Sequence, residues 1–350
     1  MTITDYTNDA MTLLTRLIAT PSVSRSEGDA ADVLCHTLEA YGLPWQREAN
    51  NVWTSTEIRP DRPTLLLNAH IDTVKPVSSW TRDPFAPTVD GDRLYGLGAN
   101  DCGGGLVSLL QVFRILTSSD TPLRHNIVYL ASAEEEVSGK DGIERVLPLL
   151  PPVDVAIVGE PTGMQPAIAE KGLMVVDGYS HGVSGHAARS EGVNAIYEAL
   201  DDLCFLRQYQ FPRVSPLLGP TLMQVTQVES GTQHNVVPDL LHFVIDIRTN
   251  ELYTNEEVLA FLQQHVKSEL RARSTRLRSS HIDTGHWLVQ RCMAMGMQPF
   301  GSPTLSDQAL MAFPSLKLGP GQSSRSHSAD EFICRSEISH AIDTYCQLLD

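Results

Sequence analysis

The feature that most constrains the fold is a series of short apolar runs that lead directly into acidic residues or a histidine. The runs at 64–68, 127–130 and 153–158 have the length and continuous apolar character of strands buried on both faces. Helical patterns at 104–116 and 143–149 lie between them. Strands that alternate with helices predict an α/β fold with a mainly parallel sheet and helices on both of its faces.

Helical patterns also lie near the two ends of the sequence. Residues 9–19 place apolar side chains on one helical face, and Pro21 follows. A second helix is expected from Asp29 to Tyr41, with Gly42 as the residue that ends it. Apolar residues at helical spacing predict a last helix: Ile338, Ala341, Ile342 and Tyr345.

The rhythm of the sequence changes after about residue 171. Strands are expected at 173–180, 221–229, 240–248 and 274–282, and helices at 193–208 and 255–270. The second of these helices opens with Thr254 and Glu257 at the spacing of a capping box. Strand, helix, strand, strand, helix, strand is the order of an α+β ferredoxin-like domain. We therefore expect a catalytic domain formed by residues 1–172 and 285–350, interrupted by a small domain at 173–284.

Charge and hydropathy narrow the choice of partners. The chain has 26 Lys and Arg against 42 Asp and Glu, and this net charge of −16 argues against a nucleic-acid or anionic-membrane surface. No apolar run approaches the roughly 20 residues that a membrane span needs, and the N-terminus has no signal-peptide pattern. The 6 cysteines show no disulfide or metal-binding spacing, as expected in a reducing compartment. A cytoplasmic protein is expected.

The residues that follow the apolar runs can bind a metal ion. They are His70, Asp72, Glu134, Glu135, Glu136, Glu160 and His327. In open α/β sheets the site lies at the carboxyl ends of the strands, so these side chains are expected to converge in one crevice. A further carboxylate, Asp101, lies in the glycine-rich loop GLGANDCGGG, just before a helix. Imidazoles together with carboxylates suit zinc or a similar divalent ion.

Each of these motifs has a simpler interpretation when it is taken alone. A histidine and an aspartate at i and i+2, as at His70 and Asp72, more often belong to a surface loop. The run of glutamates at 134–136 is more often a solvated patch, although adjacent residues after a strand point to opposite faces. The glycine-rich loop matches neither of the common nucleotide-binding patterns. The metal hypothesis therefore rests on convergence and not on any single motif.

Three polar residues stand out in the predicted inserted domain. His186 lies in SGHAAR, Asn235 lies in QHNVVPD and Arg248 lies in VIDIR. Alone, each of them is more often structural than functional.

Taken together, the motifs resemble a known enzyme family. The chain is similar to the co-catalytic zinc amidohydrolases, which include acetylornithine deacetylase, succinyl-diaminopimelate desuccinylase, aminoacylase and the glutamate carboxypeptidases. The resemblance covers nearly the whole chain, through PSVSRSEGD, NAHIDTV, GLGANDCGG, SAEEEVSG, VGEPT, GHAAR, HNVVPD, DIR and SHSADE in this order. VGEPT and the glycine–histidine pair favour the deacetylase and desuccinylase group.

The resemblance implies a metal-binding role for five residues. His70 would bind one zinc ion and His327 the other, and Asp101 would bridge the two ions. Glu136 would complete one site and Glu160 the other.

It also implies roles for residues that do not bind metal. Asp72 would orient His70, and Glu135 would be the general base. The inserted domain at 173–284 would be a lid and dimerisation domain, and His186 would reach the active site of a partner subunit across the homodimer that this domain forms. Asn235 and Arg248 would contact the substrate.

The sequence departs from the family pattern in the glycine-rich loop. Leu97 and Gly103 stand where the family usually has arginine and lysine. These changes leave the positions of the metal ligands and the base intact, and they bear on how closely the substrate pocket follows the acetylornithine enzymes.

The activity implied is metal-dependent hydrolysis of the amide bond of an N-acyl-α-amino acid. N-Acetylornithine or N-acetylcitrulline is the expected substrate, in arginine biosynthesis, and zinc is the expected ion, with cobalt or manganese as alternatives. A desuccinylase, dipeptidase or carboxypeptidase would share the same metal residues. Two further alternatives are a non-catalytic metal-binding relative and a nucleotide-binding α/β protein, the latter supported by glycines alone.

Arg189 generates a prediction about the acyl group. A cation beside His186 would suit an acyl group that itself ends in a carboxylate, such as succinyl. Arg189→Ala should then lower kcat/KM for the succinyl form of an amino acid more than for its acetyl form. An unchanged ratio of the two kcat/KM values would remove Arg189 from substrate selection.

Overall fold

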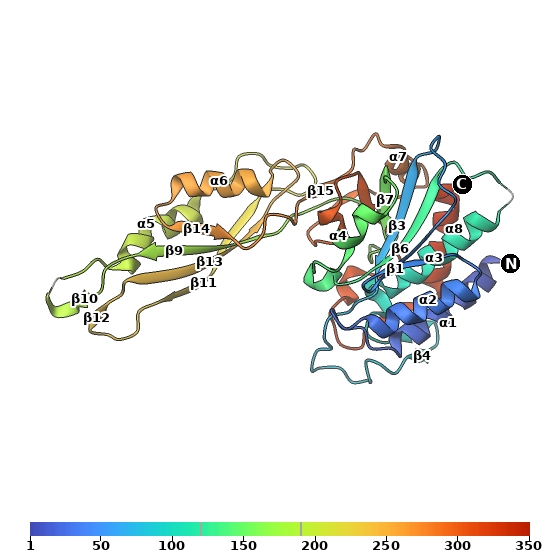
Figure 1. The fold of residues 1–350 in the computed structure, drawn as a ribbon, viewed down its shortest axis with the longest axis horizontal. Helices are drawn as coiled ribbons and strands as arrows, with labels where there is room; N and C mark the ends of the chain where they lie inside the picture. The colour runs from blue at the N-terminus through green and yellow to red at the C-terminus, as the bar shows by residue number, and fades with distance from the viewer. Residues whose placement is uncertain (120, 190) are drawn as a thin grey trace. The chain divides into compact units, whose positions relative to one another are not determined.

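The computed structural model describes residues 1–119, 121–189 and 191–350, which form two compact units (Figure 1). Unit 1 comprises Met1–Ile168, Ile282–Phe300 and Ser306–Asp350. Unit 2 comprises Ala169–His281 and Gly301–Leu305. Most of the segment 173–284 therefore lies in unit 2, and the role of this segment as a lid or dimerisation domain stays a prediction.

The larger sheet has the strand order β1-β2-β6-β3-β7-β17-β8-β15, with β16 paired to β8. Its central strands β6, β3, β7 and β17 are parallel to one another, and the outer strands are antiparallel to their neighbours. The prediction of a mainly parallel sheet is confirmed. The strand bounds are β1 (Gln46–Glu48), β2 (Asn51–Ser55), β3 (Thr64–His70), β6 (Asn126–Ser132), β7 (Val155–Val158), β8 (Ala167–Glu170), β15 (Ser280–His281), β16 (Phe300–Ser302) and β17 (Ser315–Lys317).

Helices cover both faces of this sheet. Every residue of β3 and β6 is buried, as expected for parallel strands that are covered on both sides. On one face Tyr129 donates a hydrogen bond to the Leu106 carbonyl of α3 (Gly104–Ser118). On the other face Leu66 packs in a cluster with Ile143 and Val146 of α4 (Ile143–Val146). The apolar runs of the sequence thus form a buried layer between helices.

The remaining helices of unit 1 are α1 (Ile3–Ile18), α2 (Gly28–Ala40), α7 (Trp287–Ala294) and α8 (Arg335–Leu349). Helices α1, α3 and α8 pack against one another (Figure 1). Gly42 follows α2 at φ 70°, as predicted. Helix α1 begins well before residue 9, because Thr2 and Asp5 form a capping box at its start.

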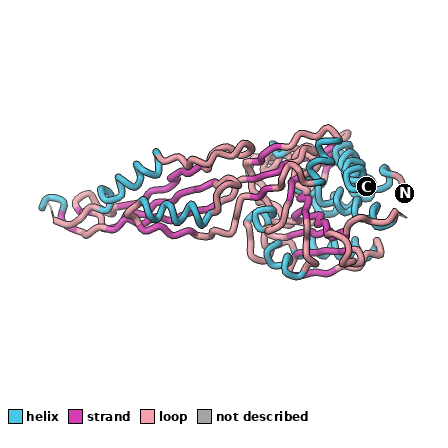
Figure 2. The backbone as a smooth tube through the Cα atoms, turned by 90° about the horizontal axis from the view of Figure 1, so that it is seen from above, coloured by secondary structure: helices cyan, strands magenta, loops and turns pink. Residues whose placement is uncertain are grey.

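Short elements complete unit 1, and Figure 2 distinguishes helices, strands and loops along the backbone. A small sheet has the order β18-β5-β4. The bounds of its strands are β18 (Phe332–Cys334), β5 (Arg93–Tyr95) and β4 (Thr88–Asp90). Short helical turns lie at Glu135–Val137, Leu147–Leu149, Asp307–Leu310 and Ser323–Arg325. The segment Ala99–Gly103 is a kinked turn whose backbone is not helical at Asp101 and Cys102. Within the described ranges, no helix is long and apolar enough to cross a membrane.

Unit 2 follows the predicted order of strands and helices. Its elements are β9 (Met174–His181), α5 (Ala195–Gln208), β11 (Leu222–Ser230), β13 (Leu240–Arg248), α6 (Asn255–His265) and β14 (Glu269–Ala272). The sheet order is β11-β13-β9-β14, so β13 lies between the two strands that α5 connects, as in a split βαβ unit. A separate pair is formed by β10 (Gly185–His186) and β12 (Val236–Val237), and the turn Ala187–Arg189 follows β10.

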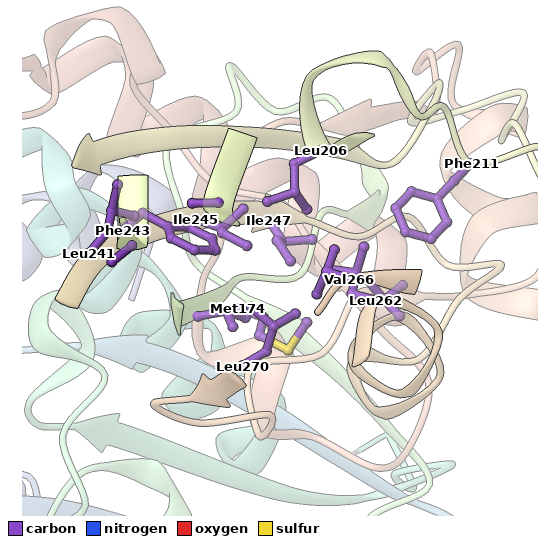
Figure 3. Packing of buried hydrophobic residues seen from close by; sticks show 14 residues of the cluster. Met174, Leu206, Phe211, Leu241, Phe243, Ile245, Ile247, Leu262, Val266 and Leu270 are labelled. Carbon is purple, nitrogen blue, oxygen red and sulfur yellow. The ribbon is translucent and has the colours of Figure 1, made fainter. Parts of the chain in front are cut away.

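The core of unit 2 lies between one face of its sheet and the two helices (Figure 3). Leu241, Phe243, Ile245 and Ile247 alternate along β13 and are at most 2% exposed. They pack in one cluster with Leu262 of α6. The opposite set of β13 side chains, which includes Arg248, therefore belongs to the other face of the sheet.

The predictions for residues 255–270 and 274–282 were partly wrong. The helix ends at His265, and a strand, β14, already begins at Glu269. The cause is the buried carboxylate of Asp202, which accepts hydrogen bonds from the backbone N–H groups of Lys267 and Ser268. These bonds turn the chain out of the helix, so the last strand comes earlier than the local pattern indicates.

Candidate metal centre

The parallel strands of unit 1 end within two residues of one another in register and lead into the predicted metal ligands. His70 ends β3 and is paired with Ser132, the last residue of β6, and the turn Glu135–Val137 follows. Val158, which ends β7, is paired with Asn68 of β3 and with Lys317, which ends β17. Because the carboxyl ends are in register, the loops that follow them meet at one edge of the sheet.

Asp101 lies between two donor sets. Its Oδ1 is 3.2 Å from His70 Nε2, and its Oδ2 is 3.7 Å from His327 Nε2. Glu160 Oε1 is 3.6 Å from His70 Nε2, and the Glu136 carboxylate is 3.0 Å from His327 Nε2. The structure therefore brings together the five residues named as ligands, in two sets that share one carboxylate.

The two histidines differ in their exposure to solvent. The side chain of His70 is 1% exposed, whereas that of His327 is 53% exposed. The side chains of Asp101, Glu136 and Glu160 are at most 14% exposed. One donor set is thus deeply buried, and the other opens toward solvent on the surface of unit 1.

The contact between Asp72 and His70 runs mainly through the backbone of Asp72. His70 Nδ1 lies 2.9 Å from the carbonyl oxygen of Asp72. The nearer oxygen of the Asp72 carboxylate is more distant from this nitrogen, at 3.6 Å. A proton on Nδ1 that is donated to this carbonyl leaves the lone pair of Nε2 facing Asp101 and Glu160. The role of Asp72 in orienting His70 stays a prediction, and the shorter contact is made by its carbonyl and not by its side chain.

The Asp72 carboxylate instead holds the turn that carries Glu135 and Glu136. Its two oxygens accept hydrogen bonds from the backbone N–H of Glu135 at 3.0 Å and of Glu136 at 3.1 Å. The hydroxyl of Ser24 donates a third bond at 2.7 Å. One buried carboxylate thus fixes the backbone of both the predicted base and a predicted ligand.

Crowding of acidic groups strongly perturbs their protonation. Burial raises the pKa of Glu135 well above the usual carboxyl range, and the charge of Glu160 adds to the shift. Burial, with the charge of Asp101, raises the pKa of Glu160 to about 8. Burial opposes ionisation of Asp101, but the hydrogen bond with His70 holds the pKa of Asp101 below its usual range. The hydrogen bond with Glu136 raises the pKa of His327 to about 9.

This donor set fits divalent metal ions. The carboxylates face one another without enough positive charge to balance them, which is unfavourable in a buried site. Imidazole nitrogens and carboxylate oxygens are ligands that zinc and similar ions accept. The ligand atoms of His70, Asp101 and Glu136 lie within 4.8 Å of one another. A divalent cation would compensate the charge that the protein alone leaves unbalanced.

Cys102 also comes close to this cluster, in a set with His70 and Glu160. Its sulfur accepts a hydrogen bond from the backbone N–H of His70 at 3.1 Å, and the side chain is buried. Burial raises the pKa of the Cys102 thiol. We therefore interpret Cys102 as packing behind the end of β3 and not as a ligand.

Two buried carboxylates were not assigned a role by the sequence analysis. Asp307 accepts hydrogen bonds from Asn68 at 2.9 Å and from Ser132 at 2.6 Å, and so joins the ends of β3 and β6. Glu331 accepts hydrogen bonds from backbone N–H groups of the loop that carries Asp101. Glu331 lies in the quoted motif SHSADE, but its partners are distant in sequence.

The four remaining predicted site residues belong to unit 2. His186 lies in β10, opposite Val236, and Asn235 immediately precedes β12. Arg189 is exposed in the turn after β10. Arg248 ends β13, and its guanidinium binds the Asp246 carboxylate through two hydrogen bonds of 2.8 and 3.1 Å. None of these four residues belongs to the cluster that unit 1 forms by itself.

The two residues that depart from the family pattern, Leu97 and Gly103, are both closely packed in unit 1. A Cβ atom at Gly103 would lie 2.4 Å from the Gly98 carbonyl oxygen and 2.6 Å from a methyl group of Leu14. Leu97 is 4% exposed. The loop around Asp101 thus has no room for a side chain at position 103.

Comparison with known proteins identifies the family. The sequence profile of peptidase family M20/M25/M40 matches residues 66–350. The chain belongs to this family. It is therefore a metal-dependent hydrolase, of the metallo-amidohydrolase or peptidase type.

Two curated relatives have named activities. An acetylornithine deacetylase from Pectobacterium carotovorum subsp. carotovorum (strain PC1) is 29% identical, in an alignment that covers 94% of this chain and 96% of the relative. A succinyl-diaminopimelate desuccinylase from Gluconobacter oxydans (strain 621H) is 28% identical over 287 residues, which cover 76% of this chain and 74% of the relative. Among solved structures, a dinuclear metal-binding M20 peptidase from Bacillus subtilis has a TM-score of 0.75 at 18% identity, and covers 99% of this chain and 98% of its own.

The donor set predicts that bound metal stabilises the protein. Ions that bind the folded chain at a thousandfold excess over Kd stabilise it by about 4 kcal/mol, equivalent to an increase in Tm of roughly 10 °C. Differential scanning calorimetry of chelator-treated protein, with and without added zinc, measures this increase. Asp101→Asn should lose most of it, and Asp61→Asn, which alters an exposed carboxylate elsewhere, should keep it. An equal increase in both variants would contradict binding at Asp101.

Proposed function

We propose that the chain hydrolyses the amide bond of an N-acyl-α-amino acid and uses two divalent ions as cofactors. Zinc is the expected ion in this proposal, with cobalt or manganese as alternatives. N-Acetylornithine or N-acetylcitrulline is the preferred substrate in this proposal. The observation that supports it most is the position of Asp101, whose two oxygens face different histidines. A shared carboxylate with a histidine and a glutamate on each side is a donor set for two ions.

Each ion would be held by its own residues and by Asp101. His70 and Glu160 would bind one ion, and His327 and Glu136 the other. When bound, such ions polarise a substrate carbonyl and lower the pKa of a water molecule. The protein contributes the orientation of His70 through the Asp72 carbonyl and the position of Glu136 through the Asp72 carboxylate.

Glu135 would move the proton. Its carboxylate would take a proton from the attacking water, whose oxygen bonds to the acyl carbon, and deliver that proton to the nitrogen of the leaving amine. The products are the free amino acid and a small carboxylic acid. Burial raises the pKa of Glu135 toward the pH at which a general base works best. The Asp72 carboxylate accepts a hydrogen bond from the backbone N–H of Glu135 as well as from that of Glu136. These bonds fix the backbone of the proposed base relative to that of the proposed ligand beside it.

The residues of unit 2 would bind and enclose the substrate. Arg248 would bind the α-carboxylate of the substrate, sharing its guanidinium with Asp246, and Asn235 would provide a further polar contact. His186 would stabilise the developing oxyanion in the active site of a partner subunit. A homodimer formed by this unit, a role in arginine biosynthesis and a cytoplasmic location remain predictions.

The extent of the alignments supports the choice of an acetyl substrate in this proposal. The acetylornithine deacetylase aligns over nearly all of both chains, whereas the desuccinylase aligns over about three quarters of each. A hydrolysis panel on metal-reconstituted protein tests the choice. We expect kcat/KM for N-acetylornithine or N-acetylcitrulline to exceed the values for N-succinyl-diaminopimelate and for dipeptides. Preferred hydrolysis of dipeptides would contradict the proposal and would indicate a peptidase. No turnover with zinc, cobalt or manganese would indicate a non-catalytic relative.

Glu135→Gln should abolish most turnover without removing metal. Loss of a general base typically costs about 10²–10⁴ in rate, and the amide cannot accept the proton from water. We expect kcat to fall by this factor while zinc content, measured by mass spectrometry, stays at the wild-type value. Glu134→Gln changes the preceding carboxylate and should retain activity. A Glu135→Gln variant with near wild-type kcat would exclude Glu135 as the base.

A further inference from the structure

The carboxylate of Glu331 is buried beneath the loop that carries Asp101. Glu331 is 2% exposed. Its Oε1 accepts hydrogen bonds from the backbone N–H of Asn100 at 2.8 Å and of Asp101 at 2.9 Å, and its Oε2 accepts one from Gly98 at 3.2 Å. Three backbone donors of one loop therefore converge on a single side chain, and one of these donors is the backbone N–H of Asp101 itself.

A group that only accepts hydrogen bonds is needed at this position. Both oxygens of Glu331 face N–H donors, and an ionised carboxylate has no hydrogen to clash with them. A glutamine would have to place its NH₂ group against one of the donors, which leaves that backbone N–H without a partner. This buried carboxyl group lies directly behind the backbone of Asp101, an arrangement that packing alone does not require.

Asn100 forms a second connection between the same two loops. Its Oδ1 accepts a hydrogen bond from the backbone N–H of Gln322 at 2.9 Å, and its Nδ2 donates to the Gln322 carbonyl at 3.0 Å. Asp101 and His327 therefore lie on loops that are joined on both sides of His327, at Gln322 and at Glu331. Movement of one ligand is limited by the position of the other.

We propose that Glu331 is a positioning residue that holds Asp101 as the ligand shared by the two metal ions. This inference rests on the metal centre proposed above. Without Glu331, the backbone N–H groups of Gly98, Asn100 and Asp101 lose their common acceptor. The Asp101 carboxylate is then less firmly held in the position that presents one oxygen to each histidine. Residues that orient a ligand in this way typically contribute about 10–100-fold to metal affinity.

Metal binding to four proteins tests the role of Glu331. They are the wild type, Glu331→Gln, Glu331→Asp and Asp330→Asn. Asp330 is a matched control, because its carboxylate also accepts hydrogen bonds from backbone N–H groups, those of Thr81 and Arg82. The loop that contains Thr81 and Arg82 carries no proposed metal ligand. Zinc stoichiometry and Kd are measured by competition with a chromophoric chelator, and the spectrum of the cobalt-loaded protein reports the ligand geometry. The Tm of the metal-free proteins reports folding.

We expect weaker metal binding in the Glu331 variants and unchanged metal binding in the Asp330 variant. Glu331→Gln should weaken the binding of at least one ion by about 10–100-fold and alter the cobalt spectrum. Glu331→Asp should recover part of the affinity, and Asp330→Asn should match the wild type. If Glu331→Gln binds two ions with wild-type Kd values and spectrum, the role is overturned while the metal centre stands. If the wild type binds no divalent ion, the metal centre is overturned and this role with it.

Hydrogen exchange of the wild type tests the same contact without a variant that must fold. In metal-free protein, the amide hydrogens of Asn100 and Asp101 should exchange slowly, because Glu331 accepts both of them. Exchange as fast as in an exposed loop would overturn the proposal.

Discussion

The carboxylate of Asp101 is the group on which the rest of the site depends. Its two oxygens face His70 and His327, which come from the end of β3 and from the loop after β17. These segments are far apart in sequence and meet because β3, β7 and β17 are parallel and end within two residues of one another in register. The fold therefore contributes to the site mainly through register, since each strand delivers its ligand to the same edge of the sheet.

Gathering so many acidic groups has an electrostatic cost. Burial and mutual repulsion raise the pKa of Glu160 to about 8 and that of Glu331 to about 7. The protein offsets part of this cost with backbone N–H groups, which hydrogen-bond to the carboxylates of Asp72 and Glu331. The same bonds fix the segments that carry Glu135, Glu136 and Asp101. Groups that reduce repulsion thus also impose geometry, and bound cations would offset the remainder.

The sequence was informative where a local pattern is linked to a rule of topology. Apolar runs that end in His70 or Glu160 predict strand ends, and parallel strands predict that these ends converge. It was not informative where a side chain acts on distant backbone. Nothing in the local pattern shows that Asp202 ends a helix at His265 or that Glu331 holds the loop of Asp101. The pairing of Arg248 with Asp246 could have been predicted from the sequence, because residues at i and i+2 of a strand share one face.

Anomalous X-ray diffraction from crystals of the zinc-loaded protein tests the central claim most directly. The account predicts two zinc ions at the ends of the parallel strands, one bound by His70 and Glu160 and the other by His327 and Glu136, with Asp101 bound to both. A single ion, or two ions that do not share Asp101, would contradict it.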